Sequence, residues 1–545
     1  MESRPTHPPR ESYVELRARP EPELLAARVA SPPPARGVTA VIVSHGMGQQ
    51  VRFETLEQVA NALRGEDAAR HGRPHGPRIT VDEVMLGETR LARAEMRVTG
   101  KDGAAREVHL YEAYWAPVTE GRVSLMDVIA FLLRSGFHSL RAVADPTFDR
   151  WMFGRWVRFA IHRFRTALEV SGVMLVLLSL ILINTLVTAV LATHSLTGGT
   201  IAWPKPDLFR QLTLDLSLVF VAVIAIVLGA MFVPRWMRPK MPRAGEKGLR
   251  AGSLVGWALV ALGFGGVVAI AVFMVIHVLS SPGKLTQMPM FGGPGPLKGR
   301  ETLEAWVVWG AALWVSFQAR GFLVEYVGDV AAYVSAHTVS KFWDMRHQIH
   351  EISMEVARAV YGARAPNGRD PAYDRIVVVG HSLGSVVAYD MLNDVILEDR
   401  LKQLPFDAAH RTEMMLTFGS PLEKTAYLFR TQRPHTAEVR EALAAAVQPM
   451  IQSYVSRPRF WVNLSSPNDI ISAPLRFYDA EDPPEGGSRR VENVTDPDAD
   501  LPLLGHNQYW TSPTFAAALH DGVTGDWTPG VKGLQAPRAA DPRQS

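Results

Sequence analysis

The pentapeptide Gly-His-Ser-Leu-Gly at residues 380–384 constrains the fold more than any other feature of the chain. An apolar run, Ile376–Val379, precedes it and an apolar helical stretch follows it. This order predicts a strand, a sharp turn and a helix, with the serine hydroxyl raised above the edge of a sheet. A side chain at Gly380 or Gly384 would collide with the neighbouring strand and helix. We therefore predict that Ser382 is a nucleophile, the alternative being an ordinary glycine-rich turn.

A second glycine-rich turn lies near the start of the chain. Val38–Val43 is a short β-branched run that ends in Ser-His-Gly-Met-Gly at 44–48, and a helical stretch from about Phe53 to Leu63 follows. Such a turn can direct a backbone N–H group toward a reacting carbonyl oxygen. We predict an oxyanion hole formed by the N–H groups of Met47 and Leu383, unless the segment is a plain strand-ending turn. Three further turn residues support the motif: His45, Gly46 and Gly48.

Acyl transfer by a serine also needs a base for the hydroxyl proton and an acid that orients the base. Three later runs are typical of strands: Met414–Phe418, Phe460–Leu464 and Arg490–Val494. Asp469 follows the second of them and His506 follows the third, where open α/β sheets place their sites. The order Ser382, Asp469, His506 is the chain order typical of an α/β sheet with this kind of serine turn.

Other residues could take these roles. Asp390 lies nearer to the serine in sequence, but it would fall in the helix after the nucleophile. The carboxylates nearest to the histidine are Asp496, Asp498 and Asp500, and with two neighbouring prolines they are typical of a solvated turn. His381 belongs to the serine turn itself, and its position points it away from the hydroxyl, so we expect it to pack or bond locally.

Four apolar segments between residues 170 and 324 are long enough to cross a bilayer, which takes about 20 residues. They are Val170–Ala192, Leu216–Val233, Ser253–Leu279 and Leu303–Val324. The fourth contains Glu304 and Arg320, so by hydropathy alone it could be a buried helix of a soluble domain. If the apolar runs before the two turns share one sheet, the chain must return to the side from which it left. That requires an even number of crossings, and we therefore predict four transmembrane spans.

Basic residues flank these segments unevenly. Four arginines precede the first span and six basic residues lie between the second and third, while the opposite loops carry fewer, which predicts cytoplasmic flanking regions. Aromatic residues are interleaved with arginines in Arg150–Arg165. This pattern predicts a helix lying in the lipid headgroup region, or else a helix that covers the core. Val123–Val143 has the same ambiguity.

Composition excludes several kinds of site. The 545 residues include no cysteine, which excludes disulfides, a thiol nucleophile and cysteine-ligated metal sites. The formal net charge of +3 is small, and apart from Arg150–Arg165, for which we predict a helix at the lipid headgroups or on the core, no basic run is interleaved with aromatic residues as on a nucleic-acid face. His347 and His350 could share a helix face, but no carboxylate or cysteine pattern completes a metal site there. We expect no cofactor, no metal and no nucleic-acid partner.

Together these motifs resemble those of the α/β-hydrolase superfamily, most closely its lipase-like and esterase-like members. The turn at 45–48 is similar to the oxyanion turn of bacterial lipases, and residues 380–384 resemble their nucleophile elbow. Later stretches are similar to those of fungal-type triacylglycerol lipases: Phe418-Gly419-Ser420-Pro421, Val462-Asn463, Asp469-Ile470, Pro474-Leu475, and His506 with Tyr509-Trp510. The resemblance covers about 38–120 and 370–515 and assigns the family's serine, acid and histidine to Ser382, Asp469 and His506.

The chain departs from secreted lipases in two ways: it carries a long insert between Trp115 and Tyr373, and it shows no export signal. After the last apolar segment, Gly328-Asp329-Val330 with Tyr333 resembles a stretch in some intracellular membrane-associated hydrolases, with no role assigned. The expected fold is an α/β-hydrolase sheet with flanking helices, interrupted by an α-helical transmembrane insert of about four spans.

This fold divides the chain into five parts. Residues 1–37 form a disordered N-terminus rich in proline and arginine, and 38–149 form the first part of the hydrolase domain with the oxyanion turn. Residues 150–340 form a membrane domain with an interfacial helix and the four spans. Residues 341–527 form the second part of the hydrolase domain with nucleophile, acid and histidine, and 528–545 form a disordered tail.

The expected function is that of a membrane-anchored serine hydrolase. It would cleave an acyl ester of a membrane lipid or acylated small molecule through an acyl-enzyme, on the cytoplasmic side of a bacterial plasma membrane. The alternatives are an acyl thioesterase or amidase, a catalytically inactive scaffold or lipid-binding protein, and a transporter. The complete set of Ser382, Asp469 and His506 argues against the scaffold, and the sparse ionisable residues in the spans argue against the transporter.

Overall fold

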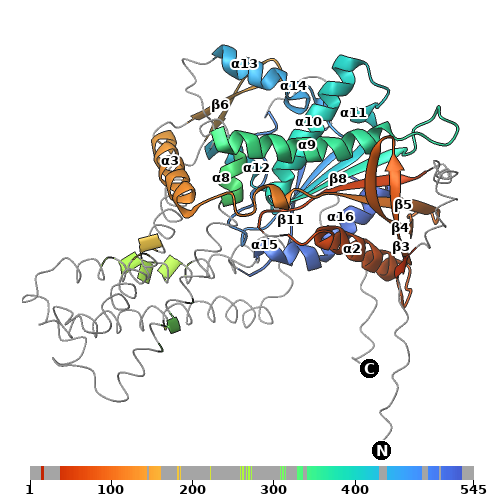
Figure 1. Ribbon diagram of the computed structural model, residues 1–545, viewed down its shortest axis with the longest axis horizontal. Helices are drawn as coiled ribbons and strands as arrows, with labels where there is room; N and C mark the ends of the chain where they lie inside the picture. The colour runs from red at the N-terminus through yellow and green to blue at the C-terminus, as the bar shows by residue number, and fades with distance from the viewer. Residues whose placement is uncertain are drawn as a thin grey trace, which may run out of the picture.

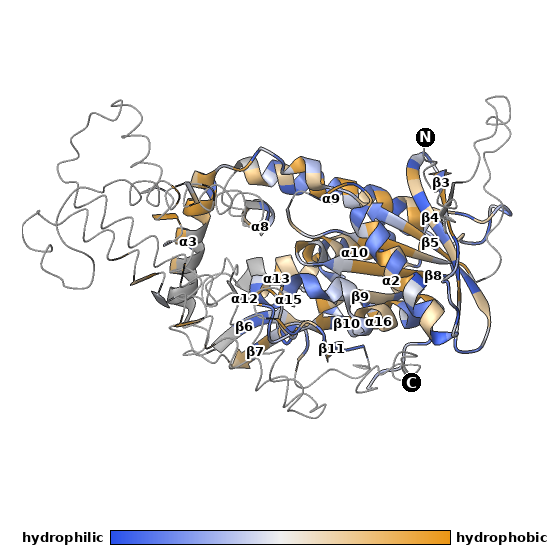
Figure 2. Ribbon diagram, turned by 90° about the horizontal axis from the view of Figure 1, so that it is seen from below, coloured by the Kyte–Doolittle hydropathy of each residue, from blue (hydrophilic) through white to orange (hydrophobic). Residues whose placement is uncertain are grey.

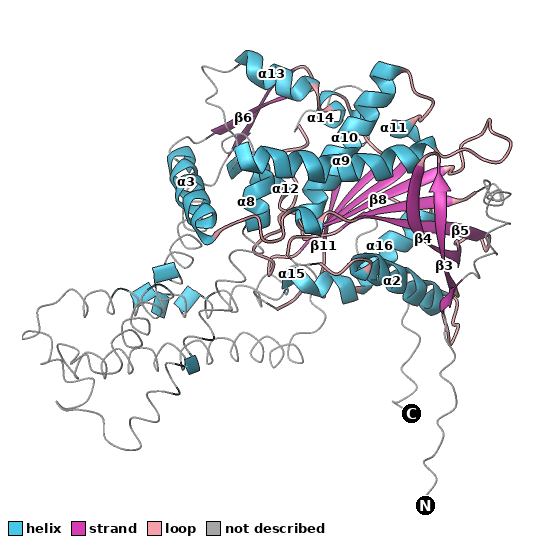
Figure 3. Ribbon diagram, viewed as in Figure 1, coloured by secondary structure: helices cyan, strands magenta, loops and turns pink. Residues whose placement is uncertain are grey.

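A computed structural model gives the fold. It describes residues 14–16, 37–48, 50–143, 147–160, 328–334, 340–428, 438–480, 489–501 and 505–530, with scattered single residues between 179 and 314. A nine-stranded sheet forms the centre of this part of the chain, and helices lie on both sides of it (Figure 1, Figure 3). The α/β class predicted from the sequence is therefore confirmed.

The strands of the sheet follow one another in an order that mixes the beginning and the end of the chain. In spatial order they are β1 (Val14–Leu16), β3 (Ile79–Leu86), β4 (Thr89–Thr99), β5 (Ala105–Ala113), β2 (Thr39–Ser44), β8 (Arg375–His381), β9 (Thr412–Phe418), β10 (Phe460–Ser465) and β11 (Val491–Thr495). Only β3–β4 and β4–β5 are antiparallel, and every other pair is parallel. The predicted strands are confirmed, with ends that differ by one or two residues.

Strands β2 and β8 pair directly, although more than three hundred residues separate them. Their register runs from Thr39 opposite Arg375 to Ser44 opposite Gly380. The expectation that the two apolar runs share one sheet is therefore confirmed. As a result, the turn that follows Ser44 lies beside the turn that contains Ser382.

The central strands are buried on both faces, which explains why their sequences are continuous apolar runs rather than alternating ones. Val41 and Val377 point to the face covered by α2 and α16, whereas Ile42 and Val378 point to the opposite face, under α9 and α10. Burying one such side chain fully contributes roughly 1.5–3 kcal/mol. Figure 2 shows that the covering helices carry both hydrophobic and hydrophilic residues, as amphipathic helices on a sheet must.

The helices of the described chain lie in two layers and at the sheet's carboxyl edge. They are α2 (Glu54–Arg70), α3 (Leu125–Val143), α8 (Gly328–Val334), α9 (Ser340–Gly362), α10 (Leu383–Lys402), α11 (Ala408–Arg411), α12 (Leu422–Leu428), α13 (Glu438–Ala446), α14 (Pro449–Gln452), α15 (Gly505–Gln508) and α16 (Pro513–Thr524). Short 3-10 turns occupy Ala116–Val118, Tyr454–Ser456 and Tyr509–Thr511. The predicted helices after the two glycine turns correspond to α2 and α10.

The first strand falls in a part of the chain for which the sequence predicts disorder. β1 pairs in parallel with β3, Val14 lying opposite Ile79. The rest of residues 1–36, and the predicted tail after residue 530, lie outside the described residues.

The helix predicted for Arg150–Arg165 is wrong. Its described part belongs to a hairpin of β6 (Thr147–Met152) and β7 (Arg155–Ala160). Phe153 and Gly154 both have positive φ, at 52° and 71°, as in the two-residue turns that close tight hairpins. Aromatic and basic residues here follow a period of two: Val157 and Phe159 are buried while Arg158 is exposed.

The hairpin packs on the protein core. The Phe153 N–H donates to Ile451 O at 2.8 Å, and its ring stacks on Tyr454 with 4.4 Å between centroids. Helix α3, the other ambiguous segment, also contributes Val128 and Phe131 to the core.

The predicted insert of four transmembrane spans is corrected as well. In the described part of the chain, no helix is both long enough and apolar enough to cross a membrane. Helix α3, next to the insert, has 19 residues but carries charged Asp127, Arg134 and Arg141. The four apolar segments between 170 and 324 lie outside the described residues, apart from scattered single positions.

Candidate active site

The turn between β8 and α10 raises Ser382 at the carboxyl edge of the sheet. Ser382 has φ 51° and ψ −129°, a backbone conformation that side-chain-bearing residues rarely adopt. Its N–H donates to Phe418 O at 3.1 Å, and its carbonyl accepts from the Ser385 N–H at 2.9 Å. Strain of this kind costs of order 1–3 kcal/mol and persists only where surrounding structure holds it. The strand, turn and helix predicted for this motif are confirmed.

The glycines around the serine are required by close backbone contacts. A β-carbon on Gly384 would lie 2.2 Å from His45 O and 2.3 Å from Ser44 O. A β-carbon on Gly380 would lie 2.6 Å from the Ser385 α-carbon. The collisions predicted for both flanking glycines are therefore confirmed. Because Gly384 has no side chain, the two glycine turns can pack against each other.

Replacing Gly384 with alanine is expected to destabilise the protein strongly, because the new methyl group meets rigid backbone. We expect Gly384→Ala to lower the free energy of unfolding by roughly 3 kcal/mol. Gly65→Ala is the matched control, since its β-carbon would meet nothing within 4 Å on the exposed face of α2. That control should gain roughly 0.5–1 kcal/mol from helix propensity. Urea denaturation of both variants measures the difference, and equal stabilities would contradict the packing described.

Asp469 and His506 form a hydrogen-bonded pair beside this turn. Asp469 lies in the loop after β10 and His506 lies in α15, with His506 Nδ1 at 3.2 Å and 3.1 Å from the two carboxylate oxygens. The carboxylate also accepts from the Ile471 N–H at 2.8 Å and from the Tyr509 hydroxyl at 3.1 Å. The Asp469 side chain is fully buried, and the His506 side chain is 15% exposed.

These contacts keep Asp469 ionised. Burial alone would raise the pKa of its carboxyl, but the hydrogen bond and charge of His506, with the Ile471 N–H, lower that pKa to about 2. Because a carboxylate only accepts, Nδ1 of His506 carries the proton in this pair. Its Nε2 is then the nitrogen available as a base.

Gly419 and Gly505 leave room for this pair. Gly419 follows β9 at φ +59°, and a β-carbon on it would lie 3.1 Å from His506 Cε1 and 3.2 Å from His381 Nε2. A β-carbon on Gly505 would lie 3.1 Å from the carbonyl of Asn468, the residue before the acid. The stretch Phe418–Pro421 thus borders the histidine.

His381 packs locally, as predicted. Its Nε2 lies 3.2 Å from His506 O, so it donates to that carbonyl, and its ring lies 4.9 Å from the rings of both His506 and Trp510. Burial, and then the charge of His506, lowers the pKa of His381 to about 3. A neutral His381 therefore supports the backbone of His506.

Ser382 is not hydrogen-bonded to His506 in this structure. Its hydroxyl is buried and has no hydrogen-bond partner among the described residues. The turn at 45–48 nevertheless packs closely against the serine turn: a β-carbon on Gly46 would lie 3.1 Å from Ser382 Cβ and 3.0 Å from His381 Nδ1. The Asp469–His506 pair and the strained turn of Ser382 thus lie at one sheet edge, without a hydrogen bond between Ser382 and His506.

The turn at 45–48 is fixed by the imidazole of His45. Its Nε2 accepts the N–H groups of Trp115 and Ala116 at 3.0 Å and 3.2 Å, so Nδ1 carries the proton and donates to Gly46 O at 2.9 Å. Burial lowers the pKa of His45 to about 4 although the bond to Gly46 opposes that change. His45 is therefore a structural, neutral residue of the turn.

The rival acids take other roles. Asp390, on α10, accepts from the Tyr333 hydroxyl at 2.8 Å and pairs with Arg346 at 3.0 Å. Asp496 is fully buried, not in a solvated turn as predicted, and burial raises the pKa of its carboxyl to about 6. Asp496 accepts from the Asp498 N–H at 2.9 Å. Of the carboxylates considered, Asp469 is the one that pairs with His506.

Two supporting residues could not be assigned from the sequence. Tyr509 stands beside His506 in a motif, but only the structure shows its hydroxyl on Asp469. Asp329 occurs in a stretch without an assigned role, and its carboxylate accepts from the Gly48 N–H at 2.8 Å.

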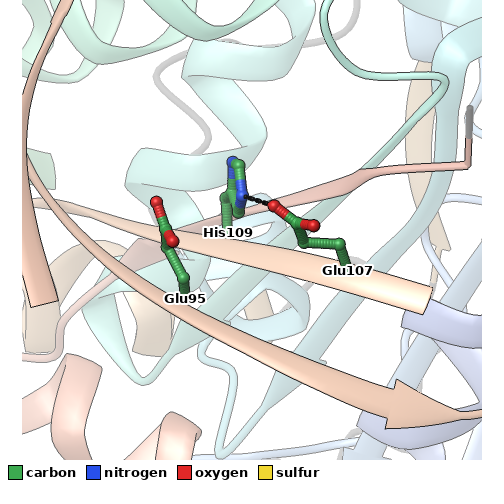
Figure 4. Close-up of side chains that lie close together, drawn as sticks. All are labelled: Glu95, Glu107 and His109. Carbon is green, nitrogen blue, oxygen red and sulfur yellow. Dashed lines mark hydrogen bonds and ion pairs between the residues drawn. The ribbon is translucent and has the colours of Figure 1, made fainter. Parts of the chain in front are cut away.

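A cluster of possible metal ligands lies elsewhere, on β4 and β5 (Figure 4). Ligand atoms of Glu95, Glu107 and His109 lie within 4.8 Å of one another. His109 Nε2 lies 2.9 Å from Glu107 Oε1, and its Nδ1 lies 3.2 Å from the Tyr373 hydroxyl. Arg93 pairs with Glu95. The arginine thus supplies the positive charge that a bound cation would bring, and both histidine nitrogens already have partners.

Comparison of the chain with protein-family models, with curated proteins and with solved structures finds no match.

Proposed function

We propose that the chain is a serine hydrolase of the α/β-hydrolase type that cleaves an acyl ester. The observation that carries this proposal is the pair of buried Asp469 and partly buried His506, at the same sheet edge as Ser382 on its strained turn. A nucleophile on a strand-to-helix turn and a histidine oriented by a carboxylate are the elements that acyl transfer requires. The site carries the proposal rather than the fold, because a parallel α/β sheet hosts many activities.

The proposed reaction uses the ionised carboxylate of Asp469 and the proton on His506 Nδ1. Ser382 Oγ attacks the acyl carbonyl while its proton passes to His506 Nε2. Asp469 stabilises the imidazolium, and the N–H groups of Met47 and Leu383 stabilise the oxyanion. The imidazolium then protonates the departing alcohol, which leaves an acyl-enzyme. His506 then deprotonates a water molecule, which attacks this ester, and the imidazolium returns that proton to Ser382 Oγ as the carboxylic acid leaves.

Formation of the serine–histidine contact is part of this mechanism. Catalytic hydrogen bonds are often long or unformed without substrate and tighten in the reactive complex. Leu383 begins α10, and N–H groups in the first turn of a helix have no carbonyl partner within it, so this donor remains available.

A second candidate is an inactive hydrolase-like binding protein. This reading is favoured by the Ser382 hydroxyl, which has no hydrogen-bond partner in the part of the chain that the structure describes, because an inactive site need not bring serine and histidine together. The two candidates differ in whether Ser382 is nucleophilic in the folded chain.

A fluorophosphonate probe decides between them. Folded full-length protein should be labelled, and peptide mass spectrometry should place the adduct on Ser382. Heat-denatured protein, in which the site is lost, should not be labelled. Folded protein that resists the probe would reject the enzyme and favour the binding protein. A series of p-nitrophenyl esters of increasing acyl length, with matched thioesters and anilides, then identifies the acyl chain and the leaving group.

A further inference from the structure

One carboxylate of helix α8, that of Asp329, contacts the turn at residues 45–48. Asp329 is 4% exposed, and its Oδ2 accepts from the Gly48 N–H at 2.8 Å across 281 residues of sequence. Gly48 has φ 94°, a conformation that favours glycine. The bond therefore holds an unusual backbone conformation directly after Met47.

The two peptide groups on either side of Met47 are both anchored. The Gly46 carbonyl accepts from His45 Nδ1, and the Gly48 N–H donates to Asp329. In a trans peptide the C=O and N–H bonds point in opposite directions. Anchoring the Gly46 carbonyl toward His45 therefore directs the Met47 N–H away from it, and anchoring the Gly48 N–H prevents the following peptide from rotating.

We propose that Asp329 is a positioning residue that holds the Met47 N–H in the direction an oxyanion hole requires. This inference rests on the proposed hydrolase function. Preorganised donors stabilise a transition state because they need no reorientation during the reaction. A charged acceptor suits this task, since hydrogen bonds to carboxylates are roughly twice as strong as neutral ones.

Helix α8 also contacts α10, the helix that begins directly after Ser382. Tyr333, one turn after Asp329, donates its hydroxyl to Asp390 on α10 at 2.8 Å. Arg346 of α9 pairs with the same carboxylate at 3.0 Å and lies 5.1 Å from the Tyr333 ring centroid. Because α10 begins directly after Ser382, α8 connects the oxyanion turn with the helix that carries the second donor, Leu383.

The test measures ester hydrolysis by Asp329→Ala. Loss of the anchor should lower kcat by about 10- to 100-fold, because a misdirected donor acts mainly in the transition state, while KM stays within about twofold. A thionoester substrate gives a second readout. Sulfur is a weak acceptor, so an intact hole favours the ester over the thionoester. Asp329→Ala should reduce this preference, which a loss of folded protein alone would not do.

Two variants complete the design. Asp329→Asn keeps the shape and an acceptor oxygen but loses the charge, so kcat should fall by about three- to tenfold, between the wild type and the alanine variant. Asp399→Ala is the matched control. Its carboxylate accepts two backbone N–H groups, from Phe406 at 3.1 Å and Ala408 at 2.9 Å, at the far end of α10. It should lower stability and leave kcat and the ester preference unchanged.

The outcomes separate this inference from the function on which it rests. Hydrolysis that is equal in wild type and Ser382→Ala would reject the proposed function itself. If hydrolysis depends on Ser382, wild-type kcat and ester preference in a folded Asp329 variant would overturn the role of Asp329. So would a change confined to KM. Should Asp329→Ala not fold, Asp329→Asn decides by the same two readouts.

Discussion

Replacing Ser382 with alanine is expected to lower kcat by about 10⁴-fold or more. The hydroxyl is the only group of the proposed site that forms a bond to the substrate carbon, so its loss leaves only binding and oxyanion stabilisation. The substitution removes a buried oxygen that has no hydrogen-bond partner among the described residues, so the fold should be retained. Turnover of p-nitrophenyl esters and circular dichroism together measure the effect.

Ser353→Ala is the matched control for this variant. Ser353 is also a buried serine, but its hydroxyl bonds to Ile349 O at 2.9 Å within α9. It should retain wild-type turnover. If Ser382→Ala keeps near-normal rates while folded, then the nucleophile has been chosen wrongly.

The second large effect is expected for Asp469→Asn, which should lower kcat by about 10⁴-fold. Against the effect of burial, the hydrogen bond and charge of His506 lower the pKa of Asp469 to about 2, so its carboxyl is ionised at every pH at which activity would be assayed, and it fixes the proton on His506 Nδ1. An asparagine amide can instead donate to Nδ1 and place the proton on Nε2, where it blocks the base. The volume of the side chain hardly changes, so the loss reports on the tautomer rather than on packing.

Asp374→Asn serves as its control. Asp374 accepts from the Gly37 N–H at 2.6 Å beside the amino ends of β2 and β8, at the sheet edge opposite the site. Its replacement should leave turnover intact. A double variant, Asp469→Asn with His506→Ala, should lose little more activity than His506→Ala alone, because residues that act as one unit are not additive. Independent, additive losses would argue against the pair as a functional unit.

The central strands were predictable from the sequence because a strand that is buried on both faces has an uninterrupted apolar sequence. Ile376–Val379 is apolar without interruption, and β8 there is fully buried. The pairing of Asp469 with His506 was predictable from a positional rule, since both residues follow strands that end at one edge of the sheet. The prediction for Arg150–Arg165 was wrong because alternating aromatic and basic residues fit a helix and a hairpin equally well. The positive φ of Phe153 and Gly154, which closes the hairpin, distinguishes the two.

Asp329 shows a different limit of sequence reasoning. Nothing local to its helix indicates that its carboxylate meets a backbone N–H 281 residues away. The transmembrane prediction is corrected by a separate finding: no helix in the described part of the chain is both long enough and apolar enough to cross a membrane.

The pairing of β2 with β8 also bears on how the chain is made. Strand β2 leaves the ribosome roughly 300 residues before its neighbour β8 exists. At about 5–20 residues per second, an apolar strand edge stays open for roughly 15–60 s, long enough for a nascent chain to aggregate. Synthesis of this protein should therefore depend on chaperones that shelter the early strands until β8 emerges.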